Sequence, residues 1–354
     1  MDLTLVKIAV ALAPVLVFLA GFMLLDAFRL VSWRTLALLL AVGGALAAAL
    51  LGALTFAAGF KALDELPIGQ SNYTMYAAPA IEEALKAAIV TALFVRNRIG
   101  FMIDATIVGF AVGSGFALVE NVVYLLVYGD KATLGVWLVR GFGTAVMHGG
   151  ATAAFGVIGQ FVTERQMKVE GARYRFHILA FLPGLAAATL IHGLYNHFPD
   201  QPILAMAVTL TAAPLALLLV FSKSEHAAHK WLVSEFETHE HMLQDIRAGR
   251  YDQSEAGRFI LAMSERFSPE VVAEAFEYLK LHTELVLRAE QTLIAHEEGA
   301  AAPNAADVRD EFARLHQLEK LLGRSALMAL RPHLQFSRHD LWEMHELKHE
   351  THAS

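Results

Sequence analysis

Seven runs of apolar residues follow one another in the first part of the chain, and each is long enough to form a helix that crosses a bilayer. A membrane-spanning helix needs about 20 predominantly apolar residues. The sequence shows no alternation typical of β-strands. The pattern predicts an all-α polytopic membrane protein with about seven transmembrane helices, near residues 4–25, 35–60, 75–95, 102–128, 134–162, 176–198 and 202–222.

After residue 222 the apolar runs end and charged residues become frequent. Residues 1–222 contain 13 Lys and Arg and 12 Asp and Glu, whereas residues 223–354 contain 15 and 23. Ser268-Pro269-Glu270 is a good helix start, because Ser caps helices and Pro suits the first helical position. We expect a transmembrane domain at 1–222 and a soluble domain at 223–354, formed by three to five helices in an antiparallel bundle.

The composition narrows the classes of protein and the available chemistry. The chain is 56% hydrophobic with a mean hydropathy of +0.45, which is too apolar for an ordinary soluble domain. Its acidic tail argues against binding of nucleic acid. The sequence contains no cysteine, which excludes disulfides, thiolate nucleophiles and Cys-based zinc sites. His and carboxylate side chains are therefore the available metal ligands.

The loops between the predicted spans differ in their content of Lys and Arg. These residues are concentrated in the first, third and fifth loops and at the start of the tail, and they are scarce in the intervening loops. Cytoplasmic loops of membrane proteins carry the excess of positive charge. The bias predicts a multi-pass protein of the cell inner membrane with its N-terminus outside and its C-terminal domain in the cytoplasm.

Three ionisable residues interrupt the third predicted span: Glu82, Glu83 and Lys86 lie within about two helical turns. An ionisable group at the bilayer centre costs at least about 2.5–3.5 kcal/mol on insertion scales. These side chains must therefore face protein, water or a metal, and an intramembrane acid is by default a candidate functional residue. Lys86 lies one turn after both acids and could hold one of them ionised.

Three later spans each carry an isolated polar cluster: Glu120-Asn121, His148 and His192 with Asn196. Counted along the predicted spans at 1.5 Å per residue, Glu82, Glu120 and His192 share one level in the outer half of the membrane. His148 comes out deeper, because the start of its span is poorly marked. We expect these polar groups to meet.

Two imidazoles and two or three carboxylates match the ligand preferences of Zn²⁺, which keeps an open water position in catalytic sites. A further carboxylate beside the metal can act as the general base for the bound water. Asn196 lies one turn after His192 on the same helix face, where its amide could hydrogen-bond an oxyanion.

These residues resemble the PrsW family of bacterial intramembrane proteases, which is related to the CAAX prenyl endopeptidases. The resemblance covers roughly residues 70–200 and lies in four motifs on successive spans: Glu82-Glu83-x-x-Lys86, Phe116-x-x-x-Glu120-Asn121, His148 and His192-x-x-x-Asn196. The related CAAX enzymes usually have His in the second motif, so Glu120 favours the PrsW branch.

The resemblance implies an endopeptidase that cleaves a membrane-anchored protein within or beside the bilayer, as PrsW enzymes cleave a membrane-bound anti-sigma factor. It implies that Glu82 and Glu83 are the catalytic pair, and the helical spacing described above adds Lys86 and Asn196 as their aids. Glu120, His148 and His192 would then be metal ligands, for Zn²⁺, or would position the water. Zinc and a metal-free, glutamate-activated water are both compatible with the sequence. The tail lies outside the resemblance, and we expect it to be regulatory or to recruit substrate.

Four other interpretations remain. The charges of the third span could form a structural ion pair. Ser114 and His192 are similar to the Ser–His pair of rhomboid-type proteases, but Ser114 lies about 9 Å deeper than Glu120 along the predicted helix. Intramembrane acids also serve ion-coupled transporters, although the sequence shows no paired halves. A non-catalytic scaffold could retain the fold.

The tail contains 12 of the 16 histidines. His345, His349 and His352 fall near one helical face, where they could bind a metal. Acidic and basic residues interleave with them, so we favour a solvated face.

Overall fold

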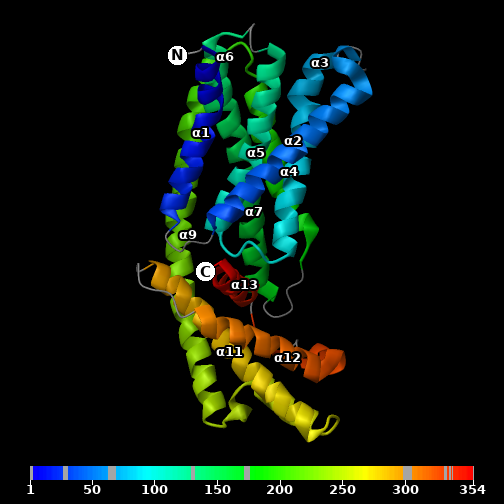
Figure 1. The fold of residues 1–354 in the computed structure, drawn as a ribbon, viewed down its shortest axis with the longest axis vertical. Helices are drawn as coiled ribbons and strands as arrows, with labels where there is room; N and C mark the ends of the chain where they lie inside the picture. Colours follow the sequence, from blue (N-terminus) through cyan, green and yellow to red (C-terminus); the bar gives the residue numbers. More distant parts are fainter. Residues whose placement is uncertain are drawn as a thin grey trace. The chain divides into compact units, whose positions relative to one another are not determined.

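The computed structural model describes residues 3–26, 31–62, 69–128, 132–170, 176–297, 305–330, 333–334, 336 and 338–353. Throughout these residues the ordered elements are helices, as the sequence predicts (Figure 1). The chain forms two compact units, one from 1–169 and 175–224 and the other from 170–174 and 225–354. Helix α9 (Pro202–Arg247) contributes residues to both.

The first unit contains α1 (Leu3–Leu25), α2 (Trp33–Ala62), α3 (Gly69–Asn72), η1 (Tyr73–Ala77), α4 (Ala78–Val95), α5 (Met102–Tyr128), α6 (Leu134–Leu138), η2 (Val139–Thr144), α7 (Ala145–Glu170), η4 (Ile178–Phe181), α8 (Leu182–Asn196) and the first half of α9. Elements η1 and η2 are π-helical turns that continue directly into α4 and α7. Wide turns of this kind are frequent at functional sites.

Six helices in the described residues are long and apolar enough to cross a membrane, and they include α1, α2, α5, α8 and the first part of α9. The sixth runs from Leu134 to Gln166 through α6, η2 and α7. The expected third span corresponds to η1 and α4. It falls outside this set because α4 carries three charged residues, Glu82, Glu83 and Lys86. These three residues carry the polar chemistry of the helix.

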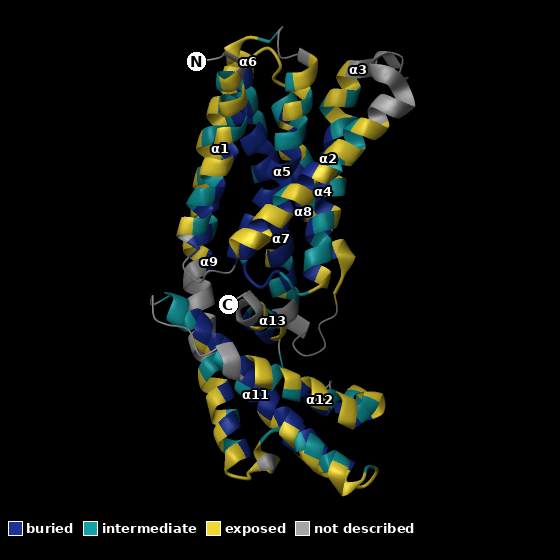
Figure 2. Cartoon of the chain, in the orientation of Figure 1, coloured by how far each residue is buried: buried dark blue, intermediate teal, exposed yellow. Residues whose placement is uncertain are grey.

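Helix α5 forms the centre of the first unit, and buried residues follow it along most of its length (Figure 2). Asp104 lies in the first turn of α5, and its carboxylate accepts hydrogen bonds from the backbone N–H groups of Gly100 and Phe101, just before the helix, at 2.6 and 2.8 Å. Glycines let neighbouring helices approach α5 closely. A Cβ at Gly43 of α2 would collide with the carbonyl of Val112.

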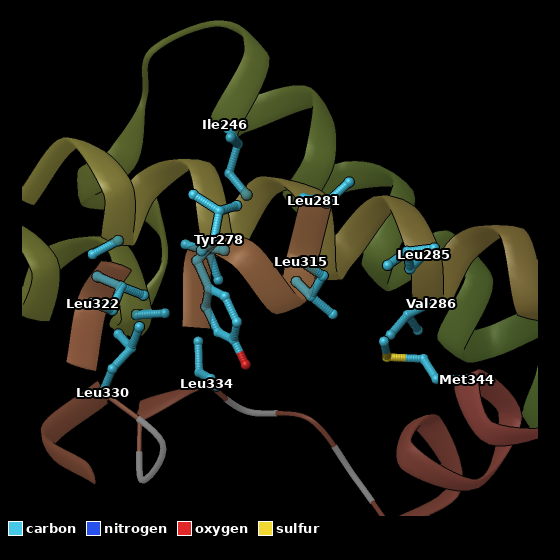
Figure 3. Packing of buried hydrophobic residues seen from close by; sticks show 14 of the residues in the cluster. Ile246, Tyr278, Leu281, Leu285, Val286, Leu315, Leu322, Leu330, Leu334 and Met344 are labelled. Carbon is cyan, nitrogen blue, oxygen red and sulfur yellow. The ribbon is translucent and has the colours of Figure 1, made fainter. Parts of the chain in front are cut away.

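The second unit contains the end of α9, η5 (Tyr251–Gln253), α10 (Glu255–Met263), α11 (Pro269–Glu297), α12 (Ala305–Leu330) and α13 (Arg338–Ala353). Ser254 caps α10 by accepting a hydrogen bond from the Gly257 N–H at 3.0 Å, and α11 begins at Pro269 as predicted. The core lies between α9, α10, α11, α12 and α13 and is apolar (Figure 3).

Candidate active site

Helix α4 supplies a buried ion pair at the centre of the first unit. Nζ of Lys86 lies 2.6 Å from Oε1 of Glu83, and both side chains are at most 1% exposed. The three-residue spacing on one helix face makes this contact possible. Lys86 also lies over the ring of Phe116, 4.6 Å from its centroid. Apolar surroundings disfavour a buried charge, and the close ammonium of Lys86 offsets this cost for the carboxylate of Glu83.

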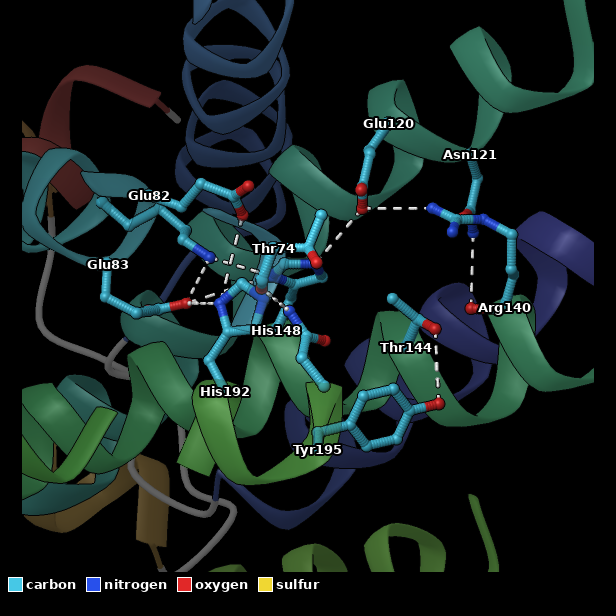
Figure 4. Close-up of polar contacts among 12 residues, drawn as sticks. Thr74, Glu82, Glu83, Glu120, Asn121, Arg140, Thr144, His148, His192 and Tyr195 are labelled. Carbon is cyan, nitrogen blue, oxygen red and sulfur yellow. Dashed lines mark hydrogen bonds and ion pairs between the residues drawn. The ribbon is translucent and has the colours of Figure 1, made fainter. Parts of the chain in front are cut away.

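His192 of α8 approaches both carboxylates of α4 (Figure 4). Its Nδ1 lies 2.9 Å from Oε1 of Glu83, which is a hydrogen bond, and 4.0 Å from Oε2 of Glu82, which is not. Oε2 of Glu82 is buried and has no hydrogen-bond partner among the described residues. A buried carboxylate oxygen without a partner is costly unless water or a cation satisfies it.

His148 of α7 joins α4 to α5. Its Nδ1 lies 2.9 Å from Nζ of Lys86, and its Nε2 lies 3.2 Å from Oε2 of Glu120. The rings of His148 and His192 meet edge to face, with centroids 4.6 Å apart. The structure therefore places His148 at the level of the other polar groups. Its apparent greater depth in the sequence arises because the helix of α6, η2 and α7 is far longer than one bilayer crossing.

Glu120 and Asn121 both contact Arg140 of η2. Nη2 of Arg140 lies 3.2 Å from Oε2 of Glu120, and its Nε donates to Oδ1 of Asn121 at 2.9 Å. The guanidinium also stacks on Tyr124, 3.6 Å from the ring centroid. Arg140 was not predicted from the sequence as a member of the polar cluster. One signal in the sequence could have found it: Arg140 is a single Arg within an apolar helix, and such an Arg needs an acidic partner such as Glu120.

Asn196 lies at the C-terminal end of α8, and its Nδ2 donates to the carbonyl of Thr74 at 2.9 Å. The contact fixes α8 against the π-helical turn that precedes α4. The neighbouring Tyr195 hydroxyl lies 3.3 Å from Oγ1 of Thr144 in η2. Both π-helical turns are thus joined to the end of α8. One N–H of the Asn196 amide remains for another acceptor.

Close helix contact at a glycine sets the position of His148. A Cβ at Gly113 of α5 would collide with the carbonyl of His148 and lie 2.7 Å from Oγ1 of Thr152. Thr152 in turn donates to Oε2 of Glu83 at 3.4 Å. Ser114, the residue of the Ser–His interpretation, is fully buried, and its hydroxyl makes no hydrogen bond to His192 or to another described residue.

Three residues of the cluster could hold a metal ion: one potential ligand atom each of Glu82, His148 and His192 lies within 4.8 Å of the others. This group contains Glu82 and not Glu120, the acid expected from the sequence as a metal ligand; the carboxylate of Glu120 pairs with Arg140. One acid and two imidazoles form a donor set typical of catalytic zinc. Three carboxylates also face only two permanent cations, Lys86 and Arg140, so a divalent ion would suit the charge balance.

A large apolar cavity of about 590 Å³ lies between α7, α8 and α9. Met147 and Ile191, the chain neighbours of His148 and His192, are part of its wall, and Ala205 and Ala212 form part of the α9 side. The cavity therefore borders the helices that carry both histidines.

Comparison with known proteins gives one family. The model of the PrsW family of intramembrane metalloproteases matches residues 31–222, which contain all the polar residues described above. No curated protein and no solved structure matches the chain. The match covers more than half of the sequence and includes the four motifs that suggested this family. The chain is a member of the PrsW family, a multi-pass intramembrane protease.

Proposed function

We propose that the cluster around Glu83 is the proteolytic centre and that it hydrolyses a peptide bond of a membrane-anchored protein, with Zn²⁺ held by Glu82, His148 and His192. The observation that carries the proposal is the buried, unpartnered Oε2 of Glu82, 4.0 Å from Nδ1 of His192. When bound, the ion would lower the pKa of a coordinated water and polarise the scissile carbonyl.

The residues of the chain supply the proton transfers. Glu83 acts as the general base: its Oε1 contacts Lys86 and His192, whereas Oε2 has the weaker contact with Thr152 and is free to take a proton from water. Water oxygen bonds to the carbonyl carbon, the C–N bond then breaks, and the proton on Glu83 passes to the leaving amine. Asn196 steadies the oxyanion with its remaining N–H.

A metal-free variant of the same reaction has one observation in its favour. Both ring nitrogens of His148 already have partners, Lys86 and Glu120. In that variant the unpartnered oxygen of Glu82 accepts the proton from water.

Metal content and cleavage of the purified protein test the assignment together. We compare wild type with Glu82→Gln, Glu83→Gln, Glu120→Gln and His192→Ala, and with Asp200→Asn, an exposed acid after α8, as the control. We expect Glu82→Gln and His192→Ala to lose zinc and cleavage, and Glu83→Gln to lose cleavage but retain zinc. Loss of zinc in Glu120→Gln with retention in Glu82→Gln would return Glu120 to the ligand set. Cleavage by Glu82→Gln, Glu83→Gln and His192→Ala would exclude this centre.

We infer from the family that the substrate resembles an anti-sigma factor with a transmembrane helix. The cavity between α7, α8 and α9 suits an apolar segment of such a helix, because its wall is apolar and includes Met147 and Ile191, the chain neighbours of the two histidines.

The positive charge of the loops supports a placement in the inner membrane with the N-terminus outside and residues 223–354 in the cytoplasm. Because the chain has no cysteine, single Cys residues at Gln201 and at Glu265 report topology without background labelling. We expect an impermeant thiol reagent to label position 201 in intact cells and position 265 only after permeabilisation. The opposite result would invert the topology.

We further propose that 1–222 is the protease domain and that 223–354 regulates cleavage or recruits substrate. Removal of residues 223–354 should change the rate or choice of substrate while the truncated protein still accumulates and retains its metal.

A further inference from the structure

The second unit contains a buried polar cluster inside an otherwise apolar bundle. Glu235 and His239 come from α9, Glu290 comes from α11, and Asp340 and Glu343 come from α13. His239, Glu290, Asp340 and Glu343 are all at most 5% exposed. The cluster lies outside residues 31–222, the part of the chain that defines the family.

His239 has contacts on both ring nitrogens, and the two differ in kind. Nδ1 lies 2.8 Å from Oε1 of Glu290, a hydrogen bond that orients the ring. Nε2 lies 3.8 Å from Oδ2 of Asp340, too far for a hydrogen bond. Two ligands that each bind a metal at about 2.0–2.2 Å can lie this far apart. This hydrogen bond uses Oε1 of Glu290 and leaves its Oε2 for a metal.

Glu343 is a candidate ligand for a cation. It is 1% exposed, and neither of its carboxylate oxygens has a hydrogen-bond partner among the described residues. Glu343 lies one helical turn after Asp340 on α13, close enough to Glu290, Asp340 and Glu235 for their charges to act on its carboxylate. Oε2 of Glu290 is likewise buried without a partner. Several acids crowded around one imidazole are costly to bury without a compensating charge.

We propose that His239, Glu290, Asp340 and Glu343 form a second metal site, which binds a divalent first-row transition-metal ion in the helical tail. One potential ligand atom each of His239, Glu290 and Asp340 lies within 4.8 Å of the others, and Glu343 supplies further oxygens. Glu235 lines an adjoining cavity of about 60 Å³ together with His239, which leaves room for water. One imidazole with several carboxylates suits Zn²⁺ or Mn²⁺ better than Mg²⁺.

The ion would join three helices that are distant in the sequence. α13 carries two of the four ligands, Asp340 and Glu343. Loss of the ion should therefore loosen α13 more than the other helices, because its acids would repel those of α9 and α11.

The test measures binding in full-length detergent-solubilised protein that carries Glu82→Gln and His192→Ala, which remove the proposed membrane site. Equilibrium dialysis against ZnCl₂, MnCl₂ or MgCl₂, followed by elemental analysis, should give about one Zn²⁺ or Mn²⁺ per chain. We expect Glu343→Gln and Asp340→Asn to weaken binding at least tenfold and His239→Ala to abolish it. Glu240→Gln, which removes an exposed acid next to His239, is the matched control and should bind normally.

Hydrogen exchange gives a second readout that is independent of proteolysis. Zn²⁺ should slow hydrogen exchange in α13 of the Glu240→Gln control, whereas it should not change the exchange rate of α13 in Glu343→Gln. Glu343→Gln also distinguishes two roles of Glu343, because Gln has the shape of a neutral carboxylic acid. The variant should lose metal binding if Glu343 is a ligand, and it should behave as the control if Glu343 is only a protonated structural acid. Unchanged metal binding in Glu343→Gln and Asp340→Asn would overturn the proposal. So would the absence of a bound ion in the background protein, which carries only Glu82→Gln and His192→Ala. If the background protein does not fold, the tail variants are made in wild type, where they should remove one ion.

Discussion

The ammonium of Lys86 lies 2.9 Å from Nδ1 of His148, although 62 residues separate them. An ammonium can only donate, so Nδ1 of His148 accepts in this contact and the proton of the neutral ring lies on Nε2, which faces Glu120. A Zn²⁺ ion bound by His148 would have to displace either Lys86 from Nδ1 or this proton from Nε2. Lys86 therefore fixes the tautomer of His148 while it neutralises Glu83. Lys86 thus contacts both Glu83, on its own helix, and His148, on α7.

Replacement of this ammonium should disable the centre. We expect Lys86→Met to reduce the cleavage rate at least about 100-fold, because general acid–base catalysis contributes about 10²–10⁴-fold and the buried Glu83 loses its counter-charge. The cost in stability should be about 3–5 kcal/mol. Cleavage in detergent and thermal unfolding measure the two effects. Lys223→Met, at an exposed position of α9, should behave as wild type.

Glu120 and Arg140 should behave as a coupled pair. We expect Arg140→Met to destabilise the protein strongly, since it leaves the carboxylate of Glu120 without its cation. The double variant Arg140→Met, Glu120→Gln should be more stable than Arg140→Met alone. A double-mutant cycle on thermal unfolding gives the coupling free energy. Additive effects would mean that the 3.2 Å contact contributes little.

The close approach at Gly113 should be essential for the position of His148. Ala at this position would force its Cβ against the carbonyl of His148, so α5 and α7 must separate. We expect Gly113→Ala to lose most cleavage activity while it still inserts into the membrane. Gly52→Ala, where a Cβ meets no atom within 4 Å, is the control. Equal activity of the two variants would show that the spacing of α5 and α7 is not critical.

A filled cavity should exclude the substrate without touching the polar cluster. We expect Ala212→Trp to raise KM for a membrane-anchored substrate and to leave metal content unchanged, because Ala212 lines the cavity. Leu219→Trp, at an exposed position of the same helix, is the matched control. An unchanged KM in Ala212→Trp would indicate that substrate enters elsewhere.

The tail should lose stability in mild acid through His282. Burial lowers the pKa of His282 to about 4. Below pH 6.5 the unfolded state therefore binds a proton at this imidazole, whereas the folded state does not bind it until the pH is near 4. Stability is therefore present above pH 6.5 and is lost as pH falls towards 4, by about 2 kcal/mol between pH 7 and 5. Hydrogen exchange of α11, corrected for intrinsic rates, measures the loss. His282→Gln should lack it, while the carboxylates with raised pKa act equally in both proteins.

The apolar runs were sufficient to predict the helices of the first unit, because a bilayer dictates their length and composition. The contact of Lys86 with Glu83 also follows from sequence spacing on one helix. The contacts of Arg140 could not be predicted from the sequence, because the depth of a residue along a helix does not give the direction in which its side chain points. The same limit applies to the ligand set. Glu82 and Glu120 share a level, and only the structure shows that Arg140 pairs with Glu120.

The tail illustrates a second limit. Its helical class was predictable from periodicity, but the histidines that the sequence suggested as possible metal ligands were His345, His349 and His352. In the structure His345 and His349 contact each other edge to face, with centroids 4.4 Å apart, and the side chain of His352 lies outside the described residues. The buried cluster instead gathers His239, Glu290 and Asp340 from three helices. Contacts across such sequence distances leave no local pattern.

The π-helical turns η1 and η2 impose a constraint on chain length. Each lies within about two helical turns of the polar residues that follow it, Glu82 and Glu83 after η1 and His148 after η2. Each residue of an α-helix rotates the chain by about 100°. A single insertion or deletion in either turn would therefore aim the carboxylates or the imidazole at lipid, even with every side chain retained. Descendants of this sequence can vary the identity of residues in these turns far more freely than their number.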